Sequence, residues 1–129
     1  MEAALRSAVL DWLRADPVLA EGLNAITEET PPAATRPWLG IAASAASEWG
    51  TKTRPGREVR LALELHTRGD EPRETALLAD RIEERIAQLP PDPSRFHIAS
   101  CAFLRSRFRQ DGRHERAMLI EYRFRILAT

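Results

Sequence analysis

Several features common in other protein classes are scarce or missing in this sequence of 129 residues. Its one cysteine, Cys101, has no second cysteine in the chain with which to form a disulfide. No apolar run reaches the about 18–20 residues of a membrane span, and Glu2 stands where a secretory signal would be basic. Positive and negative side chains both number 19, so no net charge attracts a polyanion. These absences predict one cytoplasmic domain, residues 1–129, without a disulfide or a membrane partner.

Sequence signatures of catalysis and metal binding are also missing. The chain has no P-loop, no GxGxxG and no GxSxG sequence, which excludes the common nucleotide-binding and hydrolase fingerprints. The adjacent acids Glu28-Glu29 and Glu83-Glu84 would point apart on a helix and are poorly placed for acid–base catalysis. Histidine and cysteine side chains can bind metals, but no HxxxH or CxxC motif includes His66, His97, His114 or Cys101. We therefore expect no enzymatic activity, no catalytic residue, no cofactor and no bound metal.

The composition is typical of a folded domain. Apolar residues make up 43% and charged residues 29% of the chain, which argues against disorder of the whole chain. The charge is uneven: the balance is −4 over residues 1–50, zero over 51–90 and +4 over 91–129. All bases except Lys52 are arginines, which favours forked pairing with carboxylates. An acidic and a basic part of the chain are thus available for complementary contacts.

Two segments have the apolar spacing of amphipathic helices. In residues 2–15 the apolar face consists of Leu5, Val9, Trp12 and Leu13. In residues 73–89 it consists of Leu78, Ile82, Ile86 and Leu89. Asp16-Pro17 ends the first helix and starts a short further helical turn, because proline is tolerated at a helix start. We expect the two main helices to pack on one face of a sheet.

Alternation and turn residues predict the strands. A short strand is expected over residues 37–41, and a half-buried strand over 58–67, where apolar and polar residues alternate. Two long strands, 95–109 and 114–127, are joined at Asp111-Gly112, a strong hairpin signal. The predicted fold class is therefore α+β: a mainly antiparallel sheet, two main helices on one face, the order α-β-β-α-β-β and a long C-terminal hairpin.

The hairpin register follows from the predicted turn. A two-residue turn at Asp111-Gly112 pairs Phe103 with Ile120. The inner part of the hairpin then has an apolar face, whereas one face of the outer part consists of Arg105, Arg107, Arg109, His114 and Arg116. A two-stranded ribbon without an apolar face is marginal alone in water. Residues 104–117 are therefore predicted to form an assembly arm that reaches towards a partner.

Two regions supply candidate interface residues. Residues 42–57 are small, polar and interrupted by Gly and Pro, which predicts a long mobile loop with little to bury Trp49. The candidate assembly-interface residues are Trp49, Arg105, Arg107, Arg109, Arg113 and Arg116. The arginines suit either phosphate or the acids of a partner subunit. Phe103 and Phe108 are too few as stacking aromatics for sequence-specific recognition of nucleic acid.

Four short motifs follow one another in the chain. They are Asp16-Pro17-Val18-Leu19 after the first helix, Pro37-Trp38-Leu39-Gly40-Ile41, Gly69 with Ala76, Ala79 and Ile82, and Arg109, Asp111, Gly112, Tyr122, Arg123 and Arg125 in the hairpin. In their order and spacing, over about residues 2–127, the chain resembles the tail-completion, or tail-terminator, family of long-tailed phages and phage-derived gene transfer agents. It departs from the family pattern at Glu48-Trp49-Gly50-Thr51, so the resemblance says less about this loop.

The resemblance implies a structural role. A domain of this kind is expected to form a hexameric ring that ends the tail tube and joins it to a neck or head-completion (stopper) protein. DNA would pass through the ring without sequence-specific binding. The protein would be cytoplasmic during assembly and then part of the head–tail junction of a phage or gene-transfer-agent particle. Two alternatives stay open: a head-side connector or stopper, and a nucleic-acid-binding module that uses the Arg-rich hairpin.

Overall fold

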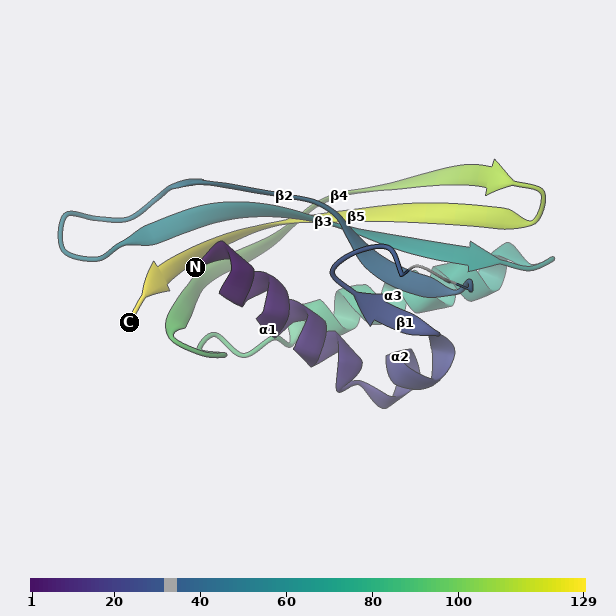
Figure 1. The fold of residues 1–129 in the computed structure, drawn as a ribbon, viewed down its shortest axis with the longest axis horizontal. Coiled ribbons are helices and arrows are strands. Elements are labelled where there is room, and N and C mark those ends of the chain that lie inside the picture. Colours follow the sequence, from purple (N-terminus) through teal and green to yellow (C-terminus); the bar gives the residue numbers. More distant parts are fainter. Residues whose placement is uncertain (32–34) are drawn as a thin grey trace.

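The computed structural model describes residues 1–31 and 35–129. These residues form a five-stranded sheet with three helices on one of its faces (Figure 1). In chain order the elements are α1 (Glu2–Arg14), α2 (Pro17–Gly22), β1 (Ala25–Thr27), β2 (Trp38–Glu48), β3 (Gly56–Arg68), α3 (Pro72–Ala87), β4 (Phe96–Gly112) and β5 (Glu115–Ala128).

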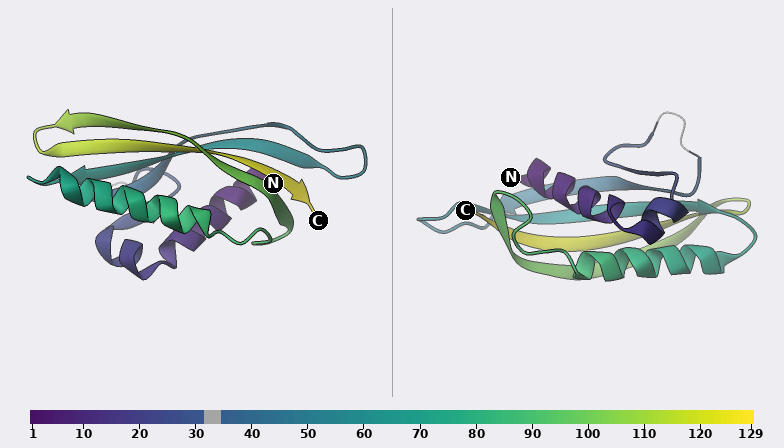
Figure 2. Two further views of the ribbon diagram at one scale, coloured as in Figure 1. Left: turned by 180° about the vertical axis from the view of Figure 1, so that it is seen from behind. Right: turned by 90° about the horizontal axis from the view of Figure 1, so that it is seen from below.

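The strand order in the sheet is β1-β2-β3-β5-β4. The short strand β1, which the sequence did not predict, is parallel to β2, whereas the other neighbours are antiparallel. β3 and β5 are therefore central and β4 is an edge. The helices lie together on one side of the sheet and leave its opposite face open (Figure 2). The predicted α+β fold class, with a mainly antiparallel sheet and helices on one face, is confirmed.

α1 and α3 bury the apolar faces predicted from their sequences. Leu5 and Ile82 are completely shielded from solvent. The helices are also joined by hydrogen bonds, because Trp12 Nε1 donates to the Arg85 carbonyl (2.7 Å) and Arg85 Nε donates to the Trp12 carbonyl (2.9 Å). The Arg85 guanidinium lies 3.5 Å from the centre of the Trp12 ring, in a cation–π contact. The predicted helices 2–15 and 73–89 are thus confirmed, with small differences at their ends.

Asp16 connects α2 with α3 from a nearly fully buried position (1% exposed). Its carboxylate caps α2 by accepting a hydrogen bond from the Leu19 N–H (3.1 Å). It also accepts two hydrogen bonds from Arg81 of α3, one of them from Nε at 3.0 Å. These bonds from Arg81 are the main reason why the pKa of Asp16 lies below its ordinary value. Ionised Asp16 therefore helps to hold the helical layer together.

Folding stability should consequently depend on Asp16 at acid pH. Because folding lowers the pKa of Asp16 below an ordinary value of about 3.9, the stabilisation is present above that pH and is lost as the pH falls through the folded-state pKa. We expect Asp16→Asn to be less stable than the wild type at neutral pH and to lose less stability on acidification. Urea unfolding across a pH series measures this, and parallel stability profiles for the two proteins would contradict it.

β2 and β3 are longer than predicted. The expectation of a long loop over residues 42–57 is wrong, because β2 continues to Glu48, β3 begins at Gly56 and residues 49–55 alone connect them. Past a bulge after Ile41, the second half of β2 pairs with β3. The small residues of this half show no alternation from which a strand could be predicted. Pairing with β3, and not the local pattern, sets their conformation.

The hairpin between β4 and β5 also turns later than predicted. Gly112 pairs with Glu115, so the turn residues are Arg113-His114 and not Asp111-Gly112. Bulges or irregularities in β4 shift the register, and Phe103 lies opposite Tyr122 instead of Ile120. His114 takes the left-handed conformation of the turn (φ 61°). The predicted hairpin is correct, whereas its register and turn are wrong.

The outer part of this hairpin is not an isolated two-stranded ribbon. β3 pairs with β5 over nearly its whole length, from Gly56↔Leu127 to Arg68↔Glu115, and so supplies a third strand. The prediction that Arg116 shares a face with Arg105, Arg107 and Arg109 is wrong, because the shifted register brings Arg116 opposite Gln110. Arg116 lies on the helix side, 9% exposed, and donates to the Gly69 carbonyl (2.9 Å).

Candidate assembly interface

The open face of the sheet carries many charged side chains in its central part. They alternate along β3, β4 and β5 with the residues that face the helices. The bases there are Arg60, Arg105, Arg107, Arg109, Arg123 and Arg125, and the acids are Glu58, Glu64 and Glu121. Bases exceed acids, and we call this set of residues the basic sheet face.

Half of these bases are neutralised within the chain. The ion pairs are Arg125–Glu58 (3.0 Å), Arg105–Glu121 (3.2 Å) and Arg109–Glu64 (3.2 Å). Within residues 1–31 and 35–129, no carboxylate lies within 4.0 Å of the charged groups of Arg60, Arg107 and Arg123. The excess positive charge of the basic sheet face therefore comes from these three side chains.

Arg60 and Arg123 are direct cross-strand neighbours on β3 and β5. Like charges in this position repel each other. In addition, Nε of Arg123 is buried and has no hydrogen-bond partner in the part of the chain that the structure describes. A carboxylate or phosphate placed over this pair would relieve the repulsion and could accept hydrogen bonds from it.

The structure gathers some of the predicted interface residues and separates others. Arg105, Arg107 and Arg109 lie together on the basic sheet face, as predicted. The Trp49 ring lies at the other end of the molecule, 5.7 Å from the Arg125 guanidinium. Arg113 is exposed in the hairpin turn, and Arg116 lies on the helix side. Arg60 and Arg123 are not among the residues predicted from the sequence, because their proximity depends on β3 and β5 being neighbours.

A network of polar contacts fixes the outer end of the sheet. It consists of Arg36–Asp111, Arg36–Glu115 (3.1 Å), Arg109–Asp111 (3.2 Å), Arg109–Glu64 (3.2 Å) and His66–Glu64 (3.1 Å). The bonds from Arg36 and Arg109 lower the pKa of Asp111, while burial lowers the pKa of His66. The His66 ring also stacks on Trp38 (4.0 Å between centroids). Asp111 is thus held by two arginines, which is why it bridges strands instead of occupying the turn.

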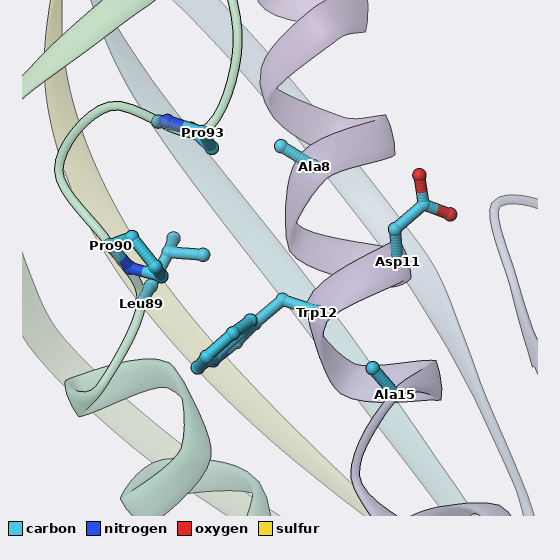
Figure 3. Close-up of a pocket in the computed structure, with 7 residues that line it drawn as sticks. All are labelled: Ala8, Asp11, Trp12, Ala15, Leu89, Pro90 and Pro93. Atoms are coloured by element: carbon cyan, nitrogen blue, oxygen red, sulfur yellow. The ribbon is translucent and has the colours of Figure 1, made fainter.

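The apolar cavity beside α1 and the single thiol offer little chemistry. A cavity of about 300 Å³ between α1 and the segment after α3 is lined mainly by apolar residues, with Asp11 at its rim (Figure 3). Cys101 is an exposed residue, but partial desolvation raises the pKa of its thiol to about 11, so the thiol is protonated at neutral pH. Neither place combines a nucleophile with a base. The described residues hold no group of three or more His, Cys, Asp or Glu side chains placed to bind a metal.

None of the described helices is long and apolar enough to cross a membrane. A helix-backed sheet whose open face carries unpaired arginines is a structure suited to binding through surfaces. Such a face suits a protein of the binding class, whose partner is another protein or a nucleic acid. The chain matches the model of the family "Tail completion protein gp17" over residues 7–127, and it belongs to this family. The family resemblance inferred from the sequence is therefore confirmed.

Two solved structures share the fold. One is a chain in the virion of a native gene transfer agent (GTA) particle, with 22% identity, a TM-score of 0.80 and coverage of 96% of this chain and 95% of that chain. The other is the bacteriophage SPP1 gp17 protein, with 18% identity, a TM-score of 0.63 and coverage of 95% and 88%. No curated protein sequence matches the chain. At these identities the structural likeness shows the common fold.

Proposed function

We propose that this structural tail completion protein is a tail terminator that forms a hexameric ring on the end of the tail tube. The observation that carries the proposal is the family match over residues 7–127, together with the TM-score of 0.80 to a chain of a GTA virion. The ring stops growth of the tube and joins it to a neck or head-completion (stopper) protein. The protein assembles in the cytoplasm and then becomes part of the head–tail junction, through which DNA passes without sequence-specific binding.

The distribution of charge supports contacts between unlike surfaces. The N-terminal 50 residues have a balance of −4 and the last 39 residues a balance of +4. Closed rings use heterologous contacts, in which two different surfaces of the subunit meet. In this proposal Trp49, Arg105, Arg107, Arg109 and Arg113 contact other chains. Arg116 contributes indirectly, because its bond to the Gly69 carbonyl fixes the end of β3.

Electron microscopy of the purified protein, combined with its mass in solution, tests the ring. We expect particles with the mass of six 14.5-kDa chains and a central opening. Deletion of the gene should leave filled heads whose tails are absent, detached or of uncontrolled length. Normal particles from a clean deletion would contradict the terminator function, and a head-side connector would instead leave complete tails without attached heads.

A nucleic-acid-binding module is a second candidate because, among the described residues, no carboxylate lies within 4.0 Å of the charged groups of Arg60, Arg107 and Arg123. Three phosphate contacts of this kind would make the affinity for DNA fall steeply with salt concentration. Titration of the isolated monomer with duplex DNA at several salt concentrations distinguishes the two candidates. Steeply salt-dependent binding by the monomer favours the module, and weak binding favours an acidic protein partner.

A further inference from the structure

Both edges of the sheet have main-chain groups without a strand partner. β4 is outermost on one side, and a loop covers only its beginning, where the Ile98 N–H donates to the Pro91 carbonyl (2.7 Å). On the other side, β1 pairs with β2 only from Trp38 to Gly40. Residues 42–48 of β2 thus have no neighbouring strand on that side within the described part of the chain. Such edges are templates for the addition of another strand.

The unpaired part of β2 and the unpaired part of β4 lie at the same height along the strand direction. One cross-strand row runs Ala46–Val59–Phe124–Cys101 from β2 to β4, and another runs Ser44–Leu61–Tyr122–Phe103. A second copy placed beside the first with the same face outward therefore brings its β2 edge against β4. The two strands would be antiparallel, because direction alternates along β2, β3, β5 and β4.

The side chains of the two edges are also complementary in size. On β4, Phe103 is 48% exposed and Phe108 is 53% exposed. One side of the Phe103 ring packs edge-on against Tyr122, with centroids 5.8 Å apart, which leaves much of the ring in water. The corresponding part of β2 is made of small residues over 42–47. A β2 edge without large side chains leaves room for the phenylalanines of a neighbouring β4.

The start of α1 adds apolar surface to the β2 edge. Ser44 Oγ donates a hydrogen bond to the Glu2 carboxylate, which holds the N-terminal turn of α1 beside this strand. Met1, next to Glu2, is itself 40% exposed. In the row arrangement Ser44 of one copy comes next to Phe103 of the other, so the N-terminal turn of α1 lies near the Phe103 ring.

We propose that β4 of one subunit pairs antiparallel with residues 42–48 of β2 in the next subunit, so that their sheets become continuous. The occupant of the β4 edge is thus a second copy of this chain. The inference rests on the proposed ring and names its subunit contact. Because β2 and β4 are different surfaces, the contact is heterologous and repeats around the ring. Every subunit then presents its basic sheet face on the same side of the continuous sheet.

Disulfide trapping with the native Cys101 tests this contact. Opposite residues of antiparallel strands have Cα atoms about 4.5–5.5 Å apart, within the about 4.4–6.8 Å that a disulfide spans. We expect Ala46→Cys, which lies in the same row and on the same face as Cys101, to give covalent oligomers upon oxidation with copper–phenanthroline. Cys101 is exposed, so the oxidant and a partner thiol can reach it. A cross-link in the Ser44→Cys variant would show that β2 and β4 pair in a register shifted by two residues.

Matched controls define the outcomes. Ala45→Cys lies on the same strand but on the opposite face, and Ala46→Cys/Cys101→Ser lacks the partner thiol, so neither should cross-link. Rings that form without a cross-link in Ala46→Cys and Ser44→Cys would overturn the edge pairing and leave the ring in place. Equal cross-linking of Ala45→Cys would overturn it as well. A wild-type chain that stays monomeric would contradict the ring and this contact together.

A substitution that does not depend on thiol chemistry gives a second test. Phe103→Lys places a charge at the centre of the proposed contact, and we expect assembly to require at least a tenfold higher protein concentration. The matched control is Leu77→Lys, because Leu77 is similarly exposed (56%) but lies on α3, outside β4 and residues 42–48 of β2. Sedimentation measures both variants, and circular dichroism checks that they are folded. Unchanged assembly of folded Phe103→Lys would contradict the proposal.

Discussion

Replacement of Leu63 by alanine should lower the free energy of unfolding by about 2–5 kcal/mol. Leu63 lies on the central strand β3, paired with Ile41 on one side and Ile120 on the other, and it is fully shielded from solvent. Because strand side chains stand perpendicular to the sheet, the lost methyl groups would leave a cavity in the core between the sheet and the helices, which the paired strands are too rigid to close. Urea unfolding, at a concentration below that of assembly, measures the effect.

The matched control for this variant is Leu77→Ala. Leu77 has the same side chain but is 56% exposed, so we expect a change within about 0.5 kcal/mol. If Leu63→Ala unfolds at the same urea concentration as Leu77→Ala, Leu63 is not in the core and the assigned register of β3 is wrong. A change in the slope of the transition would instead indicate loss of two-state unfolding.

The helices could be predicted from the sequence because their signals are local. The stripe of Leu5, Val9 and Leu13 and that of Ile82 and Ile86 each repeat with the period of a helix. Both stripes are buried as the period requires. The strand predicted over residues 58–67 rests on an equally local signal, the alternation of apolar and polar side chains, and it lies within β3.

The hairpin register and the length of β2 could not be predicted, because they depend on distant contacts. Asp111-Gly112 has the local signature of a tight turn, yet Arg36, 75 residues away in sequence, binds the Asp111 carboxylate. The bulges of β4 then shift which side chains share a face, and Arg116 is the residue most affected. For the second half of β2, the small side chains carry no pattern, and β3 supplies the pairing that extends it.

The residues of the candidate interface also divide into those that a local pattern predicts and those that depend on distant contacts. Arg105, Arg107 and Arg109 alternate within one strand, so their common face was predictable. Arg60 and Arg123 lie 63 residues apart in the sequence, and only the pairing of β3 with β5 makes them neighbours. The same pairing shows which bases are already neutralised by Glu58, Glu64 and Glu121 and which are not.

Reversal of charge on the basic sheet face should therefore act on assembly and not on folding. Arg60 and Arg107 are exposed and make no ion pair among the residues that the structure describes. We expect Arg60→Glu/Arg107→Glu to change the free energy of unfolding by less than about 0.5 kcal/mol per substitution. Reversal of Arg105, Arg107 and Arg109 together is less suitable, because it would also break the ion pairs of Arg105 and Arg109 within the chain.

The double variant should instead lose attachment of the ring to its partner. One surface ion pair contributes only about 0–1 kcal/mol, but a ring repeats each contact in every subunit, and the losses accumulate. Repulsion at every copy should reduce the yield of complete particles by more than about a hundredfold when the variant replaces the wild type. The matched control, Arg73→Glu/Arg95→Glu, has the same change of charge at exposed positions outside the basic sheet face. Normal particle yield from Arg60→Glu/Arg107→Glu, or equal losses in both double variants, would show that the basic sheet face does not carry the attachment.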